Sequence, residues 1–413
     1  MRTAILNIGQ LITMAGPPRL RIGPEMEDLG LIHDAGILVE SGRVTAVGES
    51  RVIEGLTDSE TRIVDAAGKL VSPGIVDAHT HAVFVGNRAN EFDLRSKGAS
   101  YQEIRAAGGG IQSSVNGVRN ATADQLLAET QRHLSWMLEC GNTTVEIKSG
   151  YGLNAASELA MLQAAYQAGP QRIVSTFLGA HSIPAGMSRQ TYLHEVINML
   201  PAVEPLATYC DIFVEQGYFE PEDALKLFSA TKLIPRMHAD QFGDNGGAKL
   251  AATLRCRTAD HLEHTGLGGI RAMKDGNVVP VLLPTSVLCL GLDKYAEART
   301  MIDEGLPVVL ASDFNPGTSP CPSMPVVMNL ACTQMKMTPA EAWTASTINA
   351  AHALGLGQEV GSLERGKCAD VVIHDAEDYR EVPYWFGRNT VSEVLIAGER
   401  IFSKEKAPGK AGA

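Results

Sequence analysis

The middle of the chain alternates short apolar runs with longer stretches that carry a helical repeat. A helix from Thr122 to Cys140 is plain, because apolar side chains recur along it at helical spacing. Gly141 follows at the position that often ends a helix. Eight apolar runs lie at 71–81, 140–148, 172–178, 210–214, 233–238, 256–261, 278–283 and 306–313. Eight strand–helix units over roughly 290 residues favour a (β/α)₈ barrel of the TIM type.

Short β-prone runs without intervening helices occupy both ends of the chain. The first 67 residues contain four of them, and Ser41-Gly42 joins two like a hairpin turn. The runs 369–374 and 394–402 behave alike near the other end. We therefore predict a small β-sandwich domain built from both termini. Its two parts are predicted at 1–67 and 357–413, and the barrel is predicted at 68–356.

The charge balance narrows the range of partners. Lys plus Arg number 35 and Asp plus Glu number 47, and the net charge of −12 argues against nucleic acid or an anionic membrane surface. A small anionic substrate stays compatible with this charge. We expect neither a membrane span nor a signal peptide, since no apolar run has the required length or flanks. Seven scattered cysteines without a CxxC pair indicate reduced thiols of a cytoplasmic protein.

Polar side chains stand where the predicted barrel strands end, which is the end that carries the active site in such barrels. The first run ends in His79 and His81, which project to one face of a strand and can offer two imidazoles to one ion. Two hydrogen-bonded histidines at a buried strand end are the alternative. Further strand ends carry Lys148, His181, His238, Asp260, His261 and Asp313. Histidines at four ends and an aspartate at a fifth favour an open, catalytic metal site over packing.

With these residues the chain resembles the amidohydrolase superfamily, which places His-x-His on the first strand, further histidines on the fifth and sixth, and Asp on the eighth. More narrowly, it resembles the members that open 4-imidazolone-5-propanoate to N-formimino-L-glutamate in histidine degradation. The motifs that carry the resemblance are HTH 79–81, GNR 86–88, AGGGI 107–111, EIKSGYG 146–152, GAH 179–181, HADQ 238–241, ADHLE 259–263 and SDFNPG 312–317. They cover the whole barrel, and the narrower resemblance depends on Arg88, Tyr151 and His181.

The resemblance implies a site and its partners. The implied metal ligands are His79, His81, His238 and Asp313, which hold one Zn²⁺ or Fe³⁺/Fe²⁺ per chain. The implied substrate contacts are Arg88, Tyr151, His181, Gln241, Asn315, Gly317 and Thr318. The implied catalytic residues are Asp313, His261 and Gln241, although some members have Glu at position 241 and an amide cannot act as a base. A homodimer is a further expectation.

This chemistry suits the residue types. A divalent ion lowers the pKa of a bound water to about 7, and a ring amide is a poor electrophile that needs such a nucleophile. We expect His261 to polarise the ring carbonyl or orient the water, and Asp313 to move a proton from the attacking water to the departing nitrogen. Arg88 offers a planar fork to the propanoate carboxylate.

Several assignments have alternatives. Arg88 can be a surface ion-pair residue, Tyr151 a packed turn aromatic and His181 a structural histidine. Gly108 to Gly110 form either a flexible turn or a loop that covers the substrate. Lys148 has a structural or a substrate-side role, and the histidines outside these motifs are interpreted as ordinary surface or packing residues: His33, His133, His194, His264, His352 and His374. For the whole chain, the alternatives are another cyclic amidohydrolase or heterocycle deaminase, and a non-catalytic relative that kept the fold.

Overall fold

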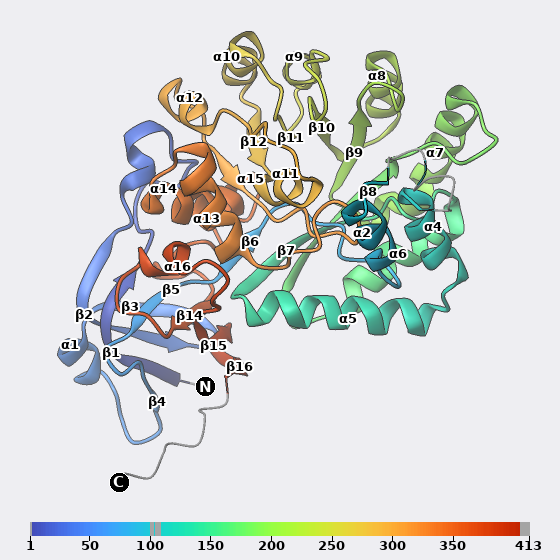
Figure 1. The fold of residues 1–413 in the computed structure, drawn as a ribbon. Helices are drawn as coiled ribbons and strands as arrows, with labels where there is room; N and C mark the ends of the chain where they lie inside the picture. The colour runs from blue at the N-terminus through green and yellow to red at the C-terminus, as the bar shows by residue number, and fades with distance from the viewer. Residues whose placement is uncertain (1, 100–102, 104–108, 405–413) are drawn as a thin grey trace.

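The computed structural model describes residues 2–99, 103 and 109–404, and two sheets dominate it (Figure 1). The first is a near-closed barrel of eight strands in sequence order, and every pairing between neighbours is parallel. A bridge between Thr80 and Phe314 brings the first and last strands together. The strands are β6 (Ile75–Asp77), β7 (Asn142–Lys148), β8 (Arg172–Ala180), β9 (Tyr209–Val214), β10 (Ile234–Ala239), β11 (Thr258–His261), β12 (Val279–Leu282) and β13 (Val309–Leu310). The predicted (β/α)₈ barrel is confirmed.

Helices follow the barrel strands and form its outer layer (Figure 1). The predicted helix after Thr122 is α5 (Ala123–Glu139), and Thr122 caps it by accepting from the backbone of Gln125. The others in the barrel part are α2 (Ala89–Ser96), α4 (Ile111–Asn120), α6 (Ala155–Gln167), α7 (Arg189–Val203), η2 (Glu204–Leu206), α8 (Pro221–Ala230), α9 (Gly247–Thr253), α10 (Leu267–Gly276), α11 (Pro284–Leu290), α12 (Ala298–Asp303), α13 (Met324–Met335), α14 (Pro339–Ala345) and α15 (Ile348–Ala353). None of the helices in the described residues is long and apolar enough to cross a membrane.

The second sheet is built from both chain ends, as predicted, and hydrogen bonds join its strands into one mixed sheet of eight (Figure 1). Its strands are β1 (Arg2–Ile12), β2 (Leu31–Glu40), β3 (Arg43–Glu49), β4 (Arg62–Asp65), β5 (Leu70–Pro73), β14 (Val371–His374), β15 (Val391–Ile396) and β16 (Glu399–Ser403). Between them lie η1 (Gly23–Glu27), α1 (Ser50–Glu54) and α16 (Glu381–Tyr384). Ile5, Leu11, Val371 and Leu395 share one buried core, so the N- and C-terminal strands stabilise each other.

Three predicted strands differ from the structure. The run 71–81 is divided, because β5 pairs with β1 and β14 in the terminal sheet and only β6 enters the barrel. The run 394–402 is a hairpin, which Ala397 and Gly398 turn with φ of 48° and 76°. The last barrel strand keeps only Val309–Leu310, since Pro307 has no N–H to give to a strand ladder.

Candidate active site

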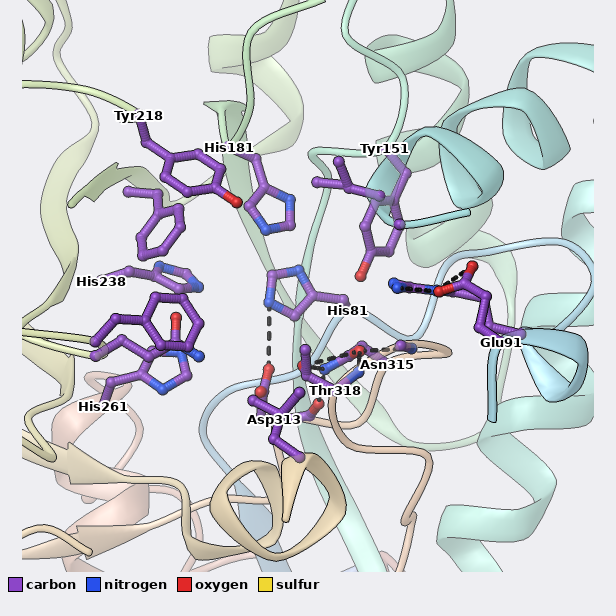
Figure 2. Close-up of a pocket in the computed structure, with 18 of the residues that line it drawn as sticks. His81, Glu91, Tyr151, His181, Tyr218, His238, His261, Asp313, Asn315 and Thr318 are labelled. Carbon is purple, nitrogen blue, oxygen red and sulfur yellow. Dashed lines mark hydrogen bonds and ion pairs between the residues drawn. The ribbon is translucent and has the colours of Figure 1, made fainter. Parts of the chain in front are cut away.

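A cavity of about 390 Å³ opens at the C-terminal ends of the barrel strands, and Figure 2 shows its lining. Eleven of the twelve site residues that the sequence predicts line it: His81, Arg88, Tyr151, His181, His238, Gln241, His261, Asp313, Asn315, Gly317 and Thr318. The twelfth, His79, is fully buried beside them. Residues spread over more than 230 positions of sequence therefore meet in one place, because parallel strands deliver their ends to the same face.

Three histidines form the centre of this cavity. The ring of His79 lies 5.3 Å from that of His81 and 4.6 Å from that of His238 between centroids. One nitrogen from each falls within 4.8 Å of the others, and His79 also shares such a group with His261 and Asp313. Asp313 Oδ1 lies 3.4 Å from His81 Nε2 (Figure 2). The same oxygen lies 3.6 Å from His79 Nε2. The four ligands implied by the resemblance converge, and His261 joins them.

Carboxylates behind two of these histidines fix which nitrogen faces the centre. His79 Nδ1 lies 2.6 Å from Asp260 Oδ2, and His238 Nδ1 lies 3.1 Å from Asp211 Oδ1. The Nε2 atoms of both histidines are buried and have no hydrogen-bond partner among the described residues. Since an ionised carboxylate accepts the Nδ1 proton, each Nε2 presents its lone pair to the centre. These orphaned nitrogens fit a bound metal ion.

Burial sets the charge state of the cluster. It lowers the pKa of His79, His81 and His238, so each imidazole is neutral at pH 7, the form that binds metal. Burial also raises the pKa of Asp313 to about 7. A cation beside this carboxylate favours its charged form, so cation and carboxylate stabilise each other.

The backbone is strained where two of these side chains leave their strands. His261, Leu262 and Asp313 have φ of 81°, 69° and 51°, a left-handed region that residues with a Cβ seldom adopt. Leu262 N donates to Ala239 O at 3.0 Å, which holds this turn against the neighbouring strand. His261 Nδ1 lies 3.2 Å from Glu263 Oε1, which leaves its Nε2 to face His79 and Asp313.

The loop after β7 presents Tyr151 to the cavity (Figure 2). The buried carboxylate of Glu158 accepts from the backbone N–H groups of Gly150, Gly152 and Leu153 at 2.7–2.9 Å. His181 donates from Nδ1 to Gly150 O at 3.2 Å and stacks on His81 with centroids 4.9 Å apart. Tyr151 and His181 are thus held rigidly on one side of the metal cluster.

Arg88 also lines the cavity and is paired within the protein. Its Nε and Nη2 donate to the two oxygens of Glu91 at 2.9 and 2.6 Å, and a Cβ at Gly317 would overlap its Nη1. Arg95, on the same helix α2, donates to Gly317 O at 3.3 Å and also lines the cavity. Glu91 and Arg95 were not predicted as site residues, although both follow Arg88 at helical spacing.

Asn315 and Thr318 use their polar atoms inside the loop after β13. Asn315 Oδ1 accepts from Gly317 N at 2.8 Å and Thr318 N at 2.7 Å, and its Nδ2 donates to Asp313 O at 2.6 Å. Thr318 Oγ1 accepts from Asn315 Nδ2 at 2.8 Å. These bonds fix the turn that carries both Asp313 and Gly317.

Of the other residues that the sequence singled out, some line the cavity and some do not. Gln241 lines the cavity and is 8% exposed, whereas Lys148 is fully buried and does not line it. Gly108 lies outside the described residues, and Gly110 lines the cavity. None of the histidines interpreted as surface or packing residues lines it: His33, His133, His194, His264, His352 and His374.

Named relatives align with almost the whole chain. An imidazolonepropionase from Solibacter usitatus (strain Ellin6076) is 46% identical over 413 residues, with 97% of this chain and 99% of the relative covered. An imidazolonepropionase from Geobacillus kaustophilus (strain HTA426) is 43% identical over 412 residues, with 96% and 97% covered. The Amidohydrolase family profile matches residues 247–401.

Solved structures share the fold at low identity. The guanine deaminase of E. coli has a TM-score of 0.72 at 16% identity and covers 98% of this chain and 100% of its own. An adenosine deaminase from Xanthomonas campestris with bound zinc has a TM-score of 0.66 at 18% identity, with 96% and 92% covered. These similarities show the architecture only. The identity of 43–46% over nearly full length shows more: the chain belongs to the imidazolonepropionase family, within the amidohydrolases.

Proposed function

We propose that the cavity hydrolyses the ring C–N bond of 4-imidazolone-5-propanoate to N-formimino-L-glutamate, with one metal ion held by His79, His81, His238 and Asp313. Imidazolonepropionase activity is the activity of the family to which the chain belongs. The observation that carries the proposed site is the convergence of these ligand atoms around two unpartnered Nε2 atoms.

The donor set suits zinc or iron. The zinc bound by the Xanthomonas adenosine deaminase, which has the same fold, supports zinc. When bound, such an ion lowers the pKa of a water ligand and so supplies a nucleophile near neutral pH. His79 and His238 would hold it through Nε2, since their Nδ1 atoms donate hydrogen bonds to Asp260 and Asp211.

Proton transfer falls to Asp313 and His261. Asp313 Oδ1 lies 3.6 Å from His79 Nε2 and 3.4 Å from His81 Nε2, so it would take a proton from the attacking water and pass this proton to the departing ring nitrogen. His261, backed by Glu263, donates from Nε2 to the oxygen that gains charge as the carbonyl is attacked. Gln241 contacts the substrate as a hydrogen-bond partner and not as a base.

This division of labour predicts opposite outcomes at two positions. Gln241→Glu should remain active, within about tenfold of the parent kcat, because a carboxylate here adds a base without removing one. His261→Asn should lower kcat by about 10²–10³-fold, the effect of losing one oxyanion donor. Steady-state kinetics with metal content measured in parallel test both. An inactive Gln241→Glu together with a fully active His261→Asn would reverse the assignment.

The propanoate carboxylate is proposed to bind between Arg88, Tyr151 and His181. Glu91 occupies the Nε and Nη2 edge of the Arg88 guanidinium, so the substrate is left with its Nη1 end. That end rests on Gly317, where only the absence of a Cβ leaves space. The cavity would therefore bind the substrate carboxylate through the Arg88 guanidinium, whose orientation Glu91 fixes.

Gly317→Ala tests this contact without touching a polar group. The new methyl group overlaps Nη1 and displaces the guanidinium, so kcat/KM should fall about 10–100-fold, mainly through KM, as one charge-assisted hydrogen bond is lost. Gly48→Ala is the control, since a Cβ at Gly48 meets nothing within 4 Å. Unchanged KM in Gly317→Ala, at an unchanged melting temperature, would refute the proposed contact.

Three broader assignments complete the proposal. All seven cysteines are free thiols, which supports a reducing, cytoplasmic location. The homodimer implied by the resemblance stays a prediction. We also propose that the barrel and the sheet from both termini are two domains, and the pairing of β5 within that sheet extends the N-terminal part to Pro73.

A further inference from the structure

Five charged side chains lie behind the proposed metal ligands, outside the cavity and with no solvent exposure. They lie on the barrel strands β7, β9, β10 and β11 and are Glu146, Lys148, Asp211, Arg236 and Asp260. Burying a charge costs several kcal/mol unless it is paired and hydrogen-bonded, so such a group needs a reason. The proposed mechanism uses Asp211 and Asp260 but leaves Lys148 without a role.

Lys148 makes close contacts with three carboxylates. Its Nζ lies 2.9 Å from Glu146 Oε1, 2.9 Å from Asp211 Oδ2 and 3.6 Å from Asp260 Oδ2. Burial and the nearby Arg236 act to lower the pKa of Lys148, but the three carboxylates outweigh them, so the pKa is raised and the ammonium stays charged. The Lys148 ammonium is therefore the common centre of these carboxylates.

Two of those carboxylates use their other contacts to hold metal-facing histidines. Asp211 binds Lys148 through Oδ2 and His238 Nδ1 through Oδ1. Asp260 Oδ2 receives His79 Nδ1 at 2.6 Å and Arg236 Nη2 at 2.9 Å, with Lys148 beyond. One lysine thus connects the supports of two ligands that come from different strands.

We propose that Lys148 is a positioning residue of the metal site, whose ammonium holds Asp211 and Asp260 in place so that they face the Nδ1 atoms of His238 and His79. This inference rests on the proposed metal ligands. With Lys148 and Arg236 the group carries two positive and three negative charges, so its net charge is −1. Without Lys148 it carries −2, and Asp211 and Asp260 lose the cation that holds them in place. An aspartate that turns away no longer accepts from Nδ1 and no longer directs Nε2 to the metal.

Lys148→Met tests the inference, because Met fills the same space without charge. The readouts are the zinc affinity of metal-free protein, by competition with a chromophoric chelator, and the visible spectrum of the cobalt-loaded protein. We expect zinc binding to weaken about 10–100-fold, as when a supporting partner of a metal ligand is lost, and the cobalt spectrum to change. Lys367→Met is the matched control, a buried lysine that pairs with Glu364 far from the cavity, and it should keep the parent zinc affinity.

A second variant decides the case in which Lys148→Met does not fold. The double variant Lys148→Met with Glu146→Gln restores the net charge of −1 but still lacks the ammonium that contacts Asp211 and Asp260. It should fold and show the same weakened zinc binding. Parent zinc affinity and cobalt spectrum in either folded variant would overturn the role of Lys148. Failure of the parent protein itself to bind zinc or iron would instead refute the proposed metal site.

Discussion

Asp313→Asn is expected to lower kcat by about 10⁴-fold or more, the upper range for loss of a general base, even in the fraction of protein that keeps its metal. The amide oxygen of Asn can still bind a cation, but it cannot take a proton from the attacking water. Asp313 is the carboxylate that lies near the Nε2 atoms of both His79 and His81, and Gln241 offers no substitute base.

The measurement is kcat normalised to bound metal. Asp370→Asn is the control, because Asp370 is equally buried but pairs with Arg172 beside the terminal sheet. It should retain the parent kcat. Near-normal turnover by metal-loaded Asp313→Asn would show that the proton moves through another group.

Arg88→Ala is expected to cost roughly 3–5 kcal/mol in recognition of the acid, which corresponds to about 10²–10⁴-fold in kcat/KM. The loss has two parts, because removal of Arg88 also leaves the buried Glu91 carboxylate unpaired next to the substrate carboxylate. Arg88→Lys should recover only part of the activity, since an ammonium cannot hold Glu91 along one edge and the substrate at the other.

Two comparisons separate those parts. Arg88→Ala with Glu91→Ala should be more active than Arg88→Ala alone, because the repulsive carboxylate is gone. An uncharged imidazolone analogue should lose little with either variant. Equal losses for the acid and the uncharged analogue would show that Arg88 does not read the carboxylate.

The convergence of the candidate metal ligands could be predicted from the sequence for a simple physical reason. In a parallel barrel each strand delivers its last residues to one face, so His79, His238 and Asp313 can be placed together without knowledge of the helices. The same reasoning placed His261 beside them. It also predicted both sheets, since strand-only and strand–helix patterns differ in period.

What the sequence did not yield depends on side-chain geometry and on strand pairing. The pairing of Arg88 with Glu91 was not predicted, because helical spacing alone does not show that these two side chains meet beside the cavity. The division of the run 71–81 between two sheets was also missed, as an apolar run does not say which partners it pairs with. One available signal was overlooked: charged residues inside apolar strands, such as Lys148 and Asp211, must be paired when the barrel closes.

The heterocycle deaminase alternative has little support. The deaminases share the fold at 16–18% identity, whereas the two imidazolonepropionases are 43% and 46% identical over nearly the whole chain. The guanidinium rim of the cavity, with Arg88 and Arg95, suits an acid more than a neutral base. The non-catalytic alternative also fails to account for the convergence of every predicted ligand at the cavity.

The central claim is that one metal ion at His79, His81, His238 and Asp313 drives ring hydrolysis. A metal titration tests this claim most directly. Metal-free protein is titrated with zinc, and in parallel with ferrous iron, and turnover is followed by the ultraviolet absorbance of 4-imidazolone-5-propanoate. We predict no turnover without metal. With at least one of the two ions, the turnover rate should rise linearly with added metal and reach its plateau at one ion per chain. Full turnover by the metal-free protein, or a rise that ends at two ions per chain, would contradict it.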